Sequence, residues 1–117
     1  MTNPVINENG TQRWYKNNRL HREDGPAVIN EDGSQEWWLN GYLHRTDGPA
    51  ILYANGTQYW YKNDKRHRED GPAIIYADGT QYWCLNGKYY SFDEYVKTIF
   101  PDECKEKMVF LLIWGDK

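Results

Sequence analysis

The chain is poor in cysteine, lacks a long apolar run and carries no large excess of charge of either sign. Its 117 residues include only Cys84 and Cys104, too few for a disulfide framework, and we expect both to be reduced, buried thiols. The longest apolar run, residues 108–114, is too short to span a bilayer. The start of the chain is polar and has no apolar stretch typical of a signal peptide. We therefore expect one soluble, cytoplasmic domain.

Charge and motif content also exclude several functional classes. A net charge of −3, with Lys and Arg dispersed along the chain, gives no basic surface for nucleic acid or anionic lipid. No phosphate-binding glycine loop, Gly-x-Ser-x-Gly elbow or Cys-x-x-Cys pair occurs, so we expect no cofactor. Aromatic residues are abundant instead, at 16% with ten Tyr and six Trp. Such a composition is typical of strands that carry large, half-buried side chains.

A repeat of 23 residues runs through most of the chain without insertion or deletion. Its markers are a glycine, a tryptophan and a histidine, followed by Gly-Pro-Ala. They recur as Gly10, Gly33, Gly56 and Gly79, as Trp14, Trp37, Trp60 and Trp83, and as His21, His44 and His67. We place the repeats at about 5–27, 28–50, 51–73 and 74–90, and a separate C-terminal segment at 91–117.

Each repeat contains two dipeptides that suit tight hairpin turns. Asn9-Gly10, Asn17-Asn18 and their equivalents combine residues that tolerate the positive φ of a type I′ turn. A third break, Asp-Gly-Pro at 24–26, is interpreted as a bulge inside a strand, because a third reversal would invert alternate repeats. The sequence predicts a mainly β fold: residues 1–90 form a single-layer antiparallel β-meander of four repeats, capped by two short C-terminal helices.

The turns predict which side chains share a face of the sheet. A two-residue turn at Asn9-Gly10 pairs Val5 with Trp14 and Ile6 with Arg13. The face that carries the repeated Trp and His hardly varies from repeat to repeat and is interpreted as architectural. The opposite face varies, and we expect it to carry the function.

Tyr, Trp and Arg dominate protein interfaces, so the variable positions are candidates for binding a protein partner. The alternative for any single residue is that it merely covers the sheet. The candidates are Tyr15, Trp38, Tyr61, Arg13, Glu36, Tyr59, Tyr82 and Arg66.

The C-terminal segment changes from strand to helix patterning. Ser91-Phe92-Asp93-Glu94 is a capping box that predicts a helix over about 92–99, and a second helix is predicted over about 102–114. An apolar stripe on the second helix would face the body of the protein; it consists of Cys104, Met108, Leu111 and Leu112. We expect the helices to cap the last repeat, with Cys84 leaving them room, and the alternative is a homodimer through residues 104–114.

Several segments resemble the MORN repeat, and most closely the MORN-like repeats of bacterial and phage proteins of mostly unknown function. These segments are Asn-Gly-x-x-His at 40–44, Tyr-Ala-Asn-Gly at 53–56 and Tyr-Ala-Asp-Gly at 76–79, within a likeness that covers about residues 5–89. The resemblance implies hairpins in one twisted sheet and a role in protein interaction or scaffolding, sometimes with lipid binding. The chain departs from the family where His-Arg-x-Asp-Gly-Pro-Ala replaces His-Gly-x-Gly.

His21, His44 and His67 each precede an Asp by three residues, which raises the alternative of a small hydrolase. We favour a structural interpretation, in which each His packs on its cross-strand Trp and hydrogen-bonds locally while Arg and Asp form a charge ladder. Repeated, near-equal copies also disfavour an active site, which is normally one asymmetric pocket. We therefore expect a non-enzymatic protein–protein interaction module, with a virus-encoded binder or inhibitor of a host protein as one form and a lipid- or carbohydrate-binding scaffold as the alternative.

Overall fold

The computed structural model describes residues 3–115, which form short antiparallel strands followed by two helices. Nine strands make one sheet in the order β1-β2-β5-β6-β9-β10-β13-β14-β15. Their bounds are Val5–Ile6 for β1, Gln12–Arg13 for β2, Val28–Ile29 for β5, Gln35–Glu36 for β6, Ile51–Leu52 for β9, Gln58–Tyr59 for β10, Ile74–Ile75 for β13, Gln81–Leu85 for β14 and Lys88–Tyr90 for β15.

Three further hairpins lie outside this main sheet, and the helices follow the last strand. The hairpins are β3 (Tyr15–Lys16) with β4 (Arg19–Leu20), β7 (Trp38–Leu39) with β8 (Tyr42–Leu43), and β11 (Tyr61–Lys62) with β12 (Lys65–Arg66). The helices are α1 (Phe92–Ile99) and α2 (Lys105–Trp114).

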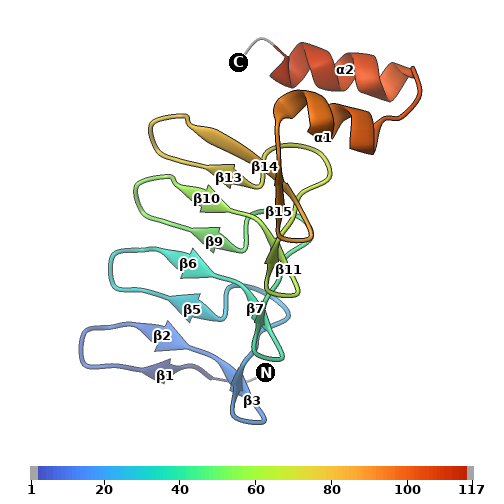
Figure 1. Cartoon of the computed structure of the whole chain (residues 1–117). Helices are drawn as coiled ribbons and strands as arrows, with labels where there is room; N and C mark the ends of the chain where they lie inside the picture. The colour runs from blue at the N-terminus through green and yellow to red at the C-terminus, as the bar shows by residue number, and fades with distance from the viewer. Residues whose placement is uncertain (1–2, 116–117) are drawn as a thin grey trace.

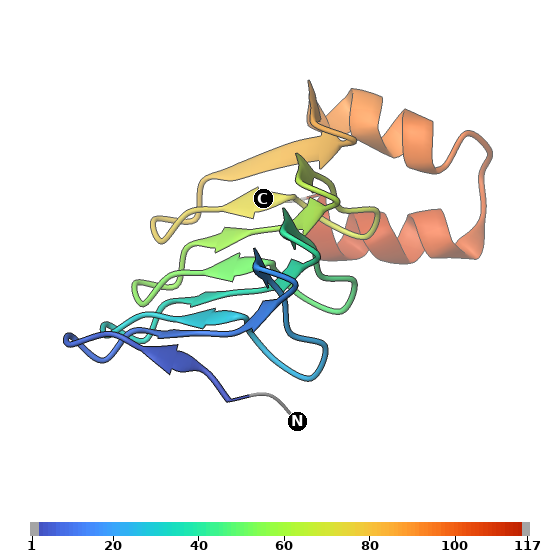
Figure 2. The same ribbon diagram turned by 90° about the horizontal axis from the view of Figure 1, so that it is seen from below.

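The arrangement confirms the predicted mainly β class with a helical C-terminal part. The strand pairs of the main sheet follow one another along the molecule, and both helices lie at the far end (Figure 1). The three small hairpins do not extend the main sheet; they rise from one side of it (Figure 2). Each of the first three units therefore has two parts, a pair of main-sheet strands and a projecting hairpin, whereas in the last unit β14 pairs with both β13 and β15.

The turns at Asn17-Asn18 and its equivalents are the predicted two-residue type. Both central residues have positive φ, for example 51° at Asn40 and 82° at Gly41. In each of these turns the first position is Asn, which reaches the left-handed region more readily than most residues, and Gly, Asn or Asp occupies the second. The projecting hairpins are thus specified locally by their turn residues.

The turns at Asn9-Gly10 and its equivalents differ from the prediction. Only the glycine has positive φ, and the Gly10 N–H donates to the Asn7 carbonyl while the Asn7 N–H donates to Thr11. This geometry is a three-residue loop with glycine in the left-handed position. One extra loop residue shifts the register by one, so Val5 pairs with Arg13 rather than with Trp14.

The Asp-Gly-Pro segments also differ from the prediction, since they lie outside the strands. Residues 23–25 bend between β4 and β5 instead of forming a bulge within one strand. The alanine that follows each Pro is fully buried at positions 27, 50 and 73. Its carbonyl accepts a hydrogen bond from the backbone N–H of the tryptophan in the same unit. The distance from the Trp14 nitrogen to the Ala27 oxygen is 2.8 Å.

The helices pack on the last unit and leave one face of the sheet uncovered. Trp83 contacts Phe92, Tyr95 and Phe110, and its ring centre lies 5.8 Å from that of Trp114. The capping box at Ser91 and Glu94 is present as predicted. Trp83 belongs to the invariant tryptophan series, so the cap covers the architectural side.

Three predictions that concern the C-terminal helices are wrong. The buried residue of α2 is Phe110, whereas the predicted inward stripe is exposed, including Leu112 at 82% and Met108 at 63%. Cys104 is exposed as well. Cys84 packs against Ala73 and Ile74 in a separate cluster, so it does not make room for the helices. Within residues 3–115, neither helix is long and apolar enough to cross a membrane.

Candidate functional site

The register of the main sheet decides which predicted residues share a face, because directly paired residues project to the same side. Tyr59 pairs with both Ile51 and Ile74, and Tyr82 pairs with Ile74. Arg13 and Glu36 hold the equivalent positions, paired through Val28. The predicted residues of the main sheet thus form one row, although they alternate with Val5, Val28, Ile51 and Ile74 and not with Ile6 and its equivalents.

The projecting hairpins add a second row to this face. Tyr15, Trp38 and Tyr61 pair with Leu20, Leu43 and Arg66 respectively. Tyr61 reaches the main-sheet row, since its ring centre lies 6.5 Å from that of Tyr59. The hairpins stand at an angle to the main sheet (Figure 2), and the two rows meet at Tyr59 and Tyr61.

A continuous chain of tyrosine rings occupies the C-terminal half of this face. Consecutive ring centres lie 5.8–6.1 Å apart at interplanar angles of 79–90°, an edge-to-face geometry that favours contact between aromatic rings. Burial and a hydrogen bond with Tyr76 raise the pKa of Tyr59. We call this the tyrosine surface, and its members are Tyr53, Tyr59, Tyr61, Tyr76, Tyr82 and Tyr89.

Arg66 lies among these rings. Its guanidinium carbon is 5.6 Å from the ring centre of Tyr59, 5.9 Å from that of Tyr61 and 6.0 Å from that of Tyr89. Its Nη1 donates to the Tyr89 hydroxyl, and its buried Nε has no acceptor among the described residues. Burial works against the charge, but hydrogen bonds to Tyr61 and Tyr89 outweigh it and raise the pKa of Arg66.

The predicted residues of the first two units form a chemically different part of the same face. Trp38 donates from its indole nitrogen to the Glu36 carboxylate at 2.8 Å. Arg13 is half-buried and Tyr15 is 41% exposed. The structure thus divides the eight predicted residues between the tyrosine surface and this polar half.

Sequence reasoning missed Tyr53, Tyr76 and Tyr89 as members of the surface. Tyr53 and Tyr76 each follow a paired isoleucine by two residues, which places them on the same face once the three-residue loop is recognised. Tyr89 lies at the repeat position that Leu20 and Leu43 occupy in the first two units. This change from leucine to tyrosine was the sequence signal for its place on the surface.

The opposite side is organised by an arginine stacked on the invariant tryptophan in the first three units. The guanidinium carbon of Arg45 lies 3.8 Å from the Trp37 ring centre, and Arg22 and Arg68 repeat this geometry on their tryptophans at 3.8 and 3.9 Å. A Cβ on Gly48 would lie 2.6 Å from the Arg45 guanidinium carbon. A side chain at Gly48 would therefore displace the stacked guanidinium, a relation that the sequence did not reveal.

The histidines join consecutive units. The Nδ1 atom of His21 accepts the backbone N–H of Asn40 at 2.9 Å, and His44 and His67 accept from Asn63 and Asn86 in the same way. These bonds span 19 residues, and in addition the predicted local bonding is present at His67, whose Nε2 lies 2.8 Å from Glu69 Oε2. Because Nδ1 is an acceptor, the neutral ring carries its proton on Nε2.

The predicted pairing of Arg with Asp is present, but each pair lies within its own unit and does not connect one unit with the next. Arg45 Nε donates to Asp47 at 3.0 Å and its Nη1 to the Pro49 carbonyl at 3.1 Å. This hydrogen bond and the charge of Arg45 lower the pKa of Asp47. The Asp carboxylates therefore serve the stacked arginines and not the histidines.

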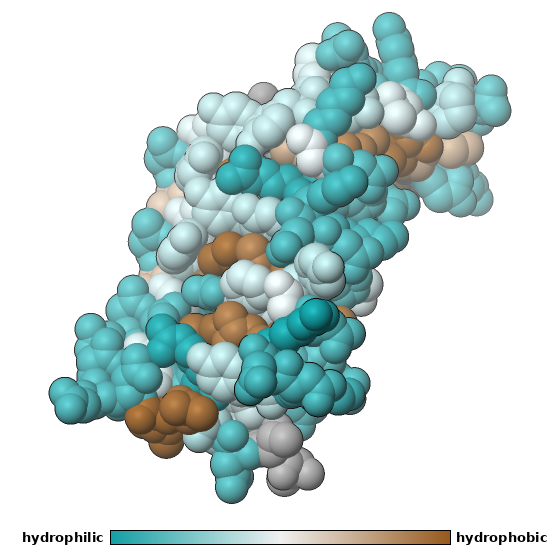
Figure 3. Space-filling model, turned by 60° about the horizontal axis from the view of Figure 1, so that its bottom comes forward, coloured by the Kyte–Doolittle hydropathy of each residue, from teal (hydrophilic) through white to brown (hydrophobic). Residues whose placement is uncertain are grey.

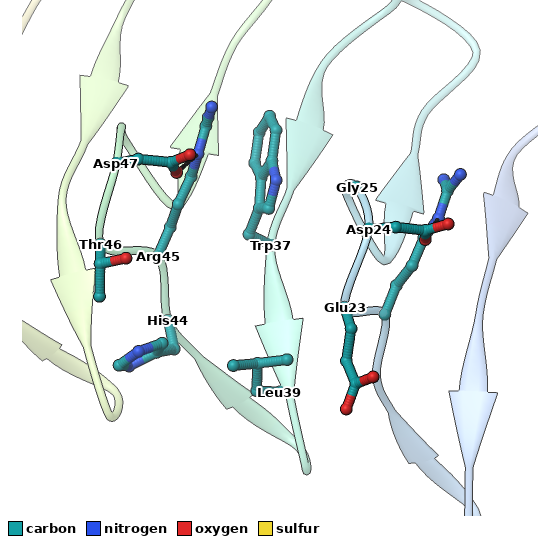
Figure 4. A pocket seen from close by; sticks show the side chains of 10 residues that line it. Glu23, Asp24, Gly25, Trp37, Leu39, His44, Arg45, Thr46 and Asp47 are labelled. Atoms are coloured by element: carbon teal, nitrogen blue, oxygen red, sulfur yellow. Dashed lines mark hydrogen bonds and ion pairs between the residues drawn. The ribbon is translucent and has the colours of Figure 1, made fainter.

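Grooves lie between successive loops on this side. The groove between the first two units has a volume of about 520 Å³, and Trp37 stands between Arg45 and the loop of Asp24 (Figure 4). His44 and Leu39 line the same groove. Over residues 3–115, no three His, Cys, Asp or Glu side chains converge in a way that could hold a metal ion.

Comparison with protein-family models, curated proteins and solved structures finds no match to the chain. The residues and their geometry are therefore the basis for the functional argument.

Proposed function

We propose that this chain is a non-enzymatic protein-interaction module that contacts a protein partner through the tyrosine surface. The observation that supports this most is the union of main-sheet and hairpin tyrosines on the face that the helices leave uncovered. Tyr82 and Tyr89 remain 43% and 48% exposed there. Tyrosine and arginine supply large contact area at low entropic cost, and they are enriched among the residues that dominate binding energy.

The properties of the surface favour a protein partner over a lipid or a carbohydrate. A MORN-like scaffold in the cytoplasm presents variable residues on a repeated frame, and a virus-encoded binder or inhibitor of a host protein would use such a surface. Lipid binding is less well supported, because the net charge is −3. Carbohydrate stacking needs flat, exposed ring faces, whereas these rings stand edge to face at 79–90°.

A hydrolase based on His and Asp is the least supported alternative. The His Nδ1 atoms are engaged by backbone amides, and each Asp is engaged by an arginine. The grooves on this side are open and lined by charges that already pair within their own units.

The test is affinity capture with matched tyrosine variants. The double variant Tyr82→Ala/Tyr89→Ala removes two exposed rings of the tyrosine surface. Tyr42→Ala removes one ring of similar exposure, 50%, from the opposite side, where Tyr42 pairs with the groove residue Leu39. Each variant is first checked for wild-type circular dichroism and thermal unfolding.

We expect one dominant protein, captured from a lysate of the native cellular environment, to be retained by Tyr42→Ala and lost by the double variant. Equal retention by both variants contradicts the tyrosine surface as the interface. Equal loss with both folded also contradicts it, because the opposite side would then contribute as much.

A second contact surface is proposed on α2, as a homodimer through residues 104–114. Leu112, Met108, Val109 and Ile113 are 82%, 63%, 55% and 51% exposed, an apolar area with no covering element among the described residues. Figure 3 shows hydrophobic residues in separate patches, one of them over the helical end. Sedimentation velocity tests this proposal. We expect the wild type to be a dimer and Leu112→Glu to be a monomer. A wild type that remains monomeric at a protein concentration of about 100 µM contradicts the proposal.

A further inference from the structure

We propose that Arg66 and the tyrosine hydroxyls around it form a carboxylate-binding site, which anchors one Asp or Glu side chain of the protein partner. This inference rests on the proposed function and specifies the chemistry of the partner. The supporting observation is that the Arg66 guanidinium, on the uncovered face, has no carboxylate partner among the described residues.

Arg66 differs from the stacked arginines of the same chain in having no carboxylate. Arg22, Arg45 and Arg68 each pair with an Asp two residues later, at 2.9–3.0 Å. Within residues 3–115, no Asp or Glu lies within ion-pair distance of Arg66. A half-buried guanidinium without a carboxylate partner is uncommon, because its desolvation is normally offset by a counter-charge.

The hydrogen-bonding capacity of Arg66 is also incompletely used. A guanidinium has five N–H donors, and here Nη1 donates to the Tyr89 hydroxyl, the Tyr61 ring lies beside the group, and the buried Nε–H has no acceptor among the described residues. A carboxylate matches the planar fork of the guanidinium and accepts two parallel hydrogen bonds from it. The two tyrosine hydroxyls can then donate to the same carboxylate, since a hydroxyl both accepts and donates.

The surroundings favour a single carboxylate over a phosphate or an acidic run. Lys62 and Lys65 pair with each other and therefore project to the other side of the hairpin from Tyr61 and Arg66. One cation among neutral rings balances one negative charge, whereas a phosphate carries about two. The net charge of −3 further disfavours a densely acidic ligand.

The repeat provides a substitution that should preserve the fold. Arg66 occupies the position of Leu20 and Leu43, so Arg66→Leu installs the residue that two other units already carry. Arg19→Leu is the matched control, because it removes the same charge from the opposite side of a hairpin, where Arg19 pairs with Lys16.

The experiment uses a displayed library of random 12-residue peptides, selected in parallel against the wild type, Arg66→Leu and Arg19→Leu. We expect the wild-type and Arg19→Leu pools to share an Asp or Glu at one position, and the Arg66→Leu pool to lack it. The best wild-type peptide is then synthesised with Glu or Asp, and with Gln or Asn, at that position. By calorimetry, the amide peptide should bind the wild type at least about tenfold more weakly, and Arg66→Leu should bind both peptides alike.

Four results would overturn the inference. Pools without a shared acidic position, or equal affinity of the wild type for the acid and amide peptides, would remove the carboxylate preference. Discrimination that persists in Arg66→Leu would assign it to another residue. A wild type that selects no peptide would also overturn the inference, and the capture experiment with Tyr82→Ala/Tyr89→Ala would still decide the proposed function separately.

Discussion

Replacing Gly48 by Ala tests whether the stacked arginine holds the repeat together. The added Cβ would lie 2.6 Å from the Arg45 guanidinium carbon and 2.9 Å from its Nε, so the guanidinium has to leave the Trp37 ring. Gly48 does not have positive φ, so the backbone itself accepts alanine. The substitution therefore reports on the stack and not on the turn.

The expected cost follows from the contacts that the movement breaks. Loss of the cation–π stack costs about 0.5–2 kcal/mol, and loss of the hydrogen bond to the Pro49 carbonyl costs about 1 kcal/mol. The ion pair with Asp47, whose side chain is 87% exposed, adds about 0–0.5 kcal/mol. Alanine lowers the entropy of the unfolded chain, which returns about 0.4–1 kcal/mol. We expect a net loss of about 1–2 kcal/mol in the free energy of unfolding.

Urea unfolding followed by tryptophan fluorescence measures this loss, and a double-mutant cycle assigns it. In an Arg45→Ala background no guanidinium is present, so Gly48→Ala should cost nothing or stabilise slightly. An equal cost of Gly48→Ala with and without Arg45 would refute the stacking argument.

Two further predictions concern the cap and the contacts between units. Tyr95→Phe removes the hydroxyl that donates to the Arg68 carbonyl, and we expect a loss of about 1 kcal/mol in thermal or urea unfolding; an unchanged midpoint contradicts this. Burial raises the pKa of Tyr95, so the folded state holds its proton where the unfolded chain releases it, and stability should fall as pH rises above about 10. This alkaline loss should be smaller in Tyr95→Phe. His44→Phe keeps the ring but removes the acceptor of the Asn63 N–H; because this bond is exposed, we expect a loss of about 0.5–1 kcal/mol, and no loss would show that the contact between units contributes little.

The sequence predicted the fold class well because its strongest signals are local. A positive φ is needed at both positions of Asn40-Gly41, and few residue pairs supply it. The capping box at Ser91 likewise depends only on residues three apart. These features required no knowledge of distant contacts.

The register was missed because Asn-Gly fits two turn types. In both, glycine occupies the left-handed position, and only the bonding of the flanking residues distinguishes them. At Asn9-Gly10, the Asn9 side chain accepts the Thr11 N–H at 3.0 Å, which supports the longer loop. The Thr or Ser after the glycine in every unit was a signal for this geometry.

The candidate site was predicted only in part, because its extent depends on the register that the sequence did not reveal. Repeat variation correctly grouped Tyr59, Tyr61 and Arg66 on one side, but the extent of the tyrosine surface depended on the register and on the angle of the hairpins. The inward face of α2 depended on which of its residues meets Trp83, a tertiary contact that helical periodicity alone does not specify.

The most direct test of the central claim is site-specific photo-crosslinking to the partner. Benzoylphenylalanine is placed at position 82 on the tyrosine surface, and at position 42 on the opposite side as the matched control, since the two tyrosines are similarly exposed at 43% and 50%. After irradiation in the native cellular environment, mass spectrometry identifies the attached proteins. The proposed function predicts one protein attached specifically at position 82 and absent at position 42, whereas attachment at position 42 alone, or at neither position, would contradict it.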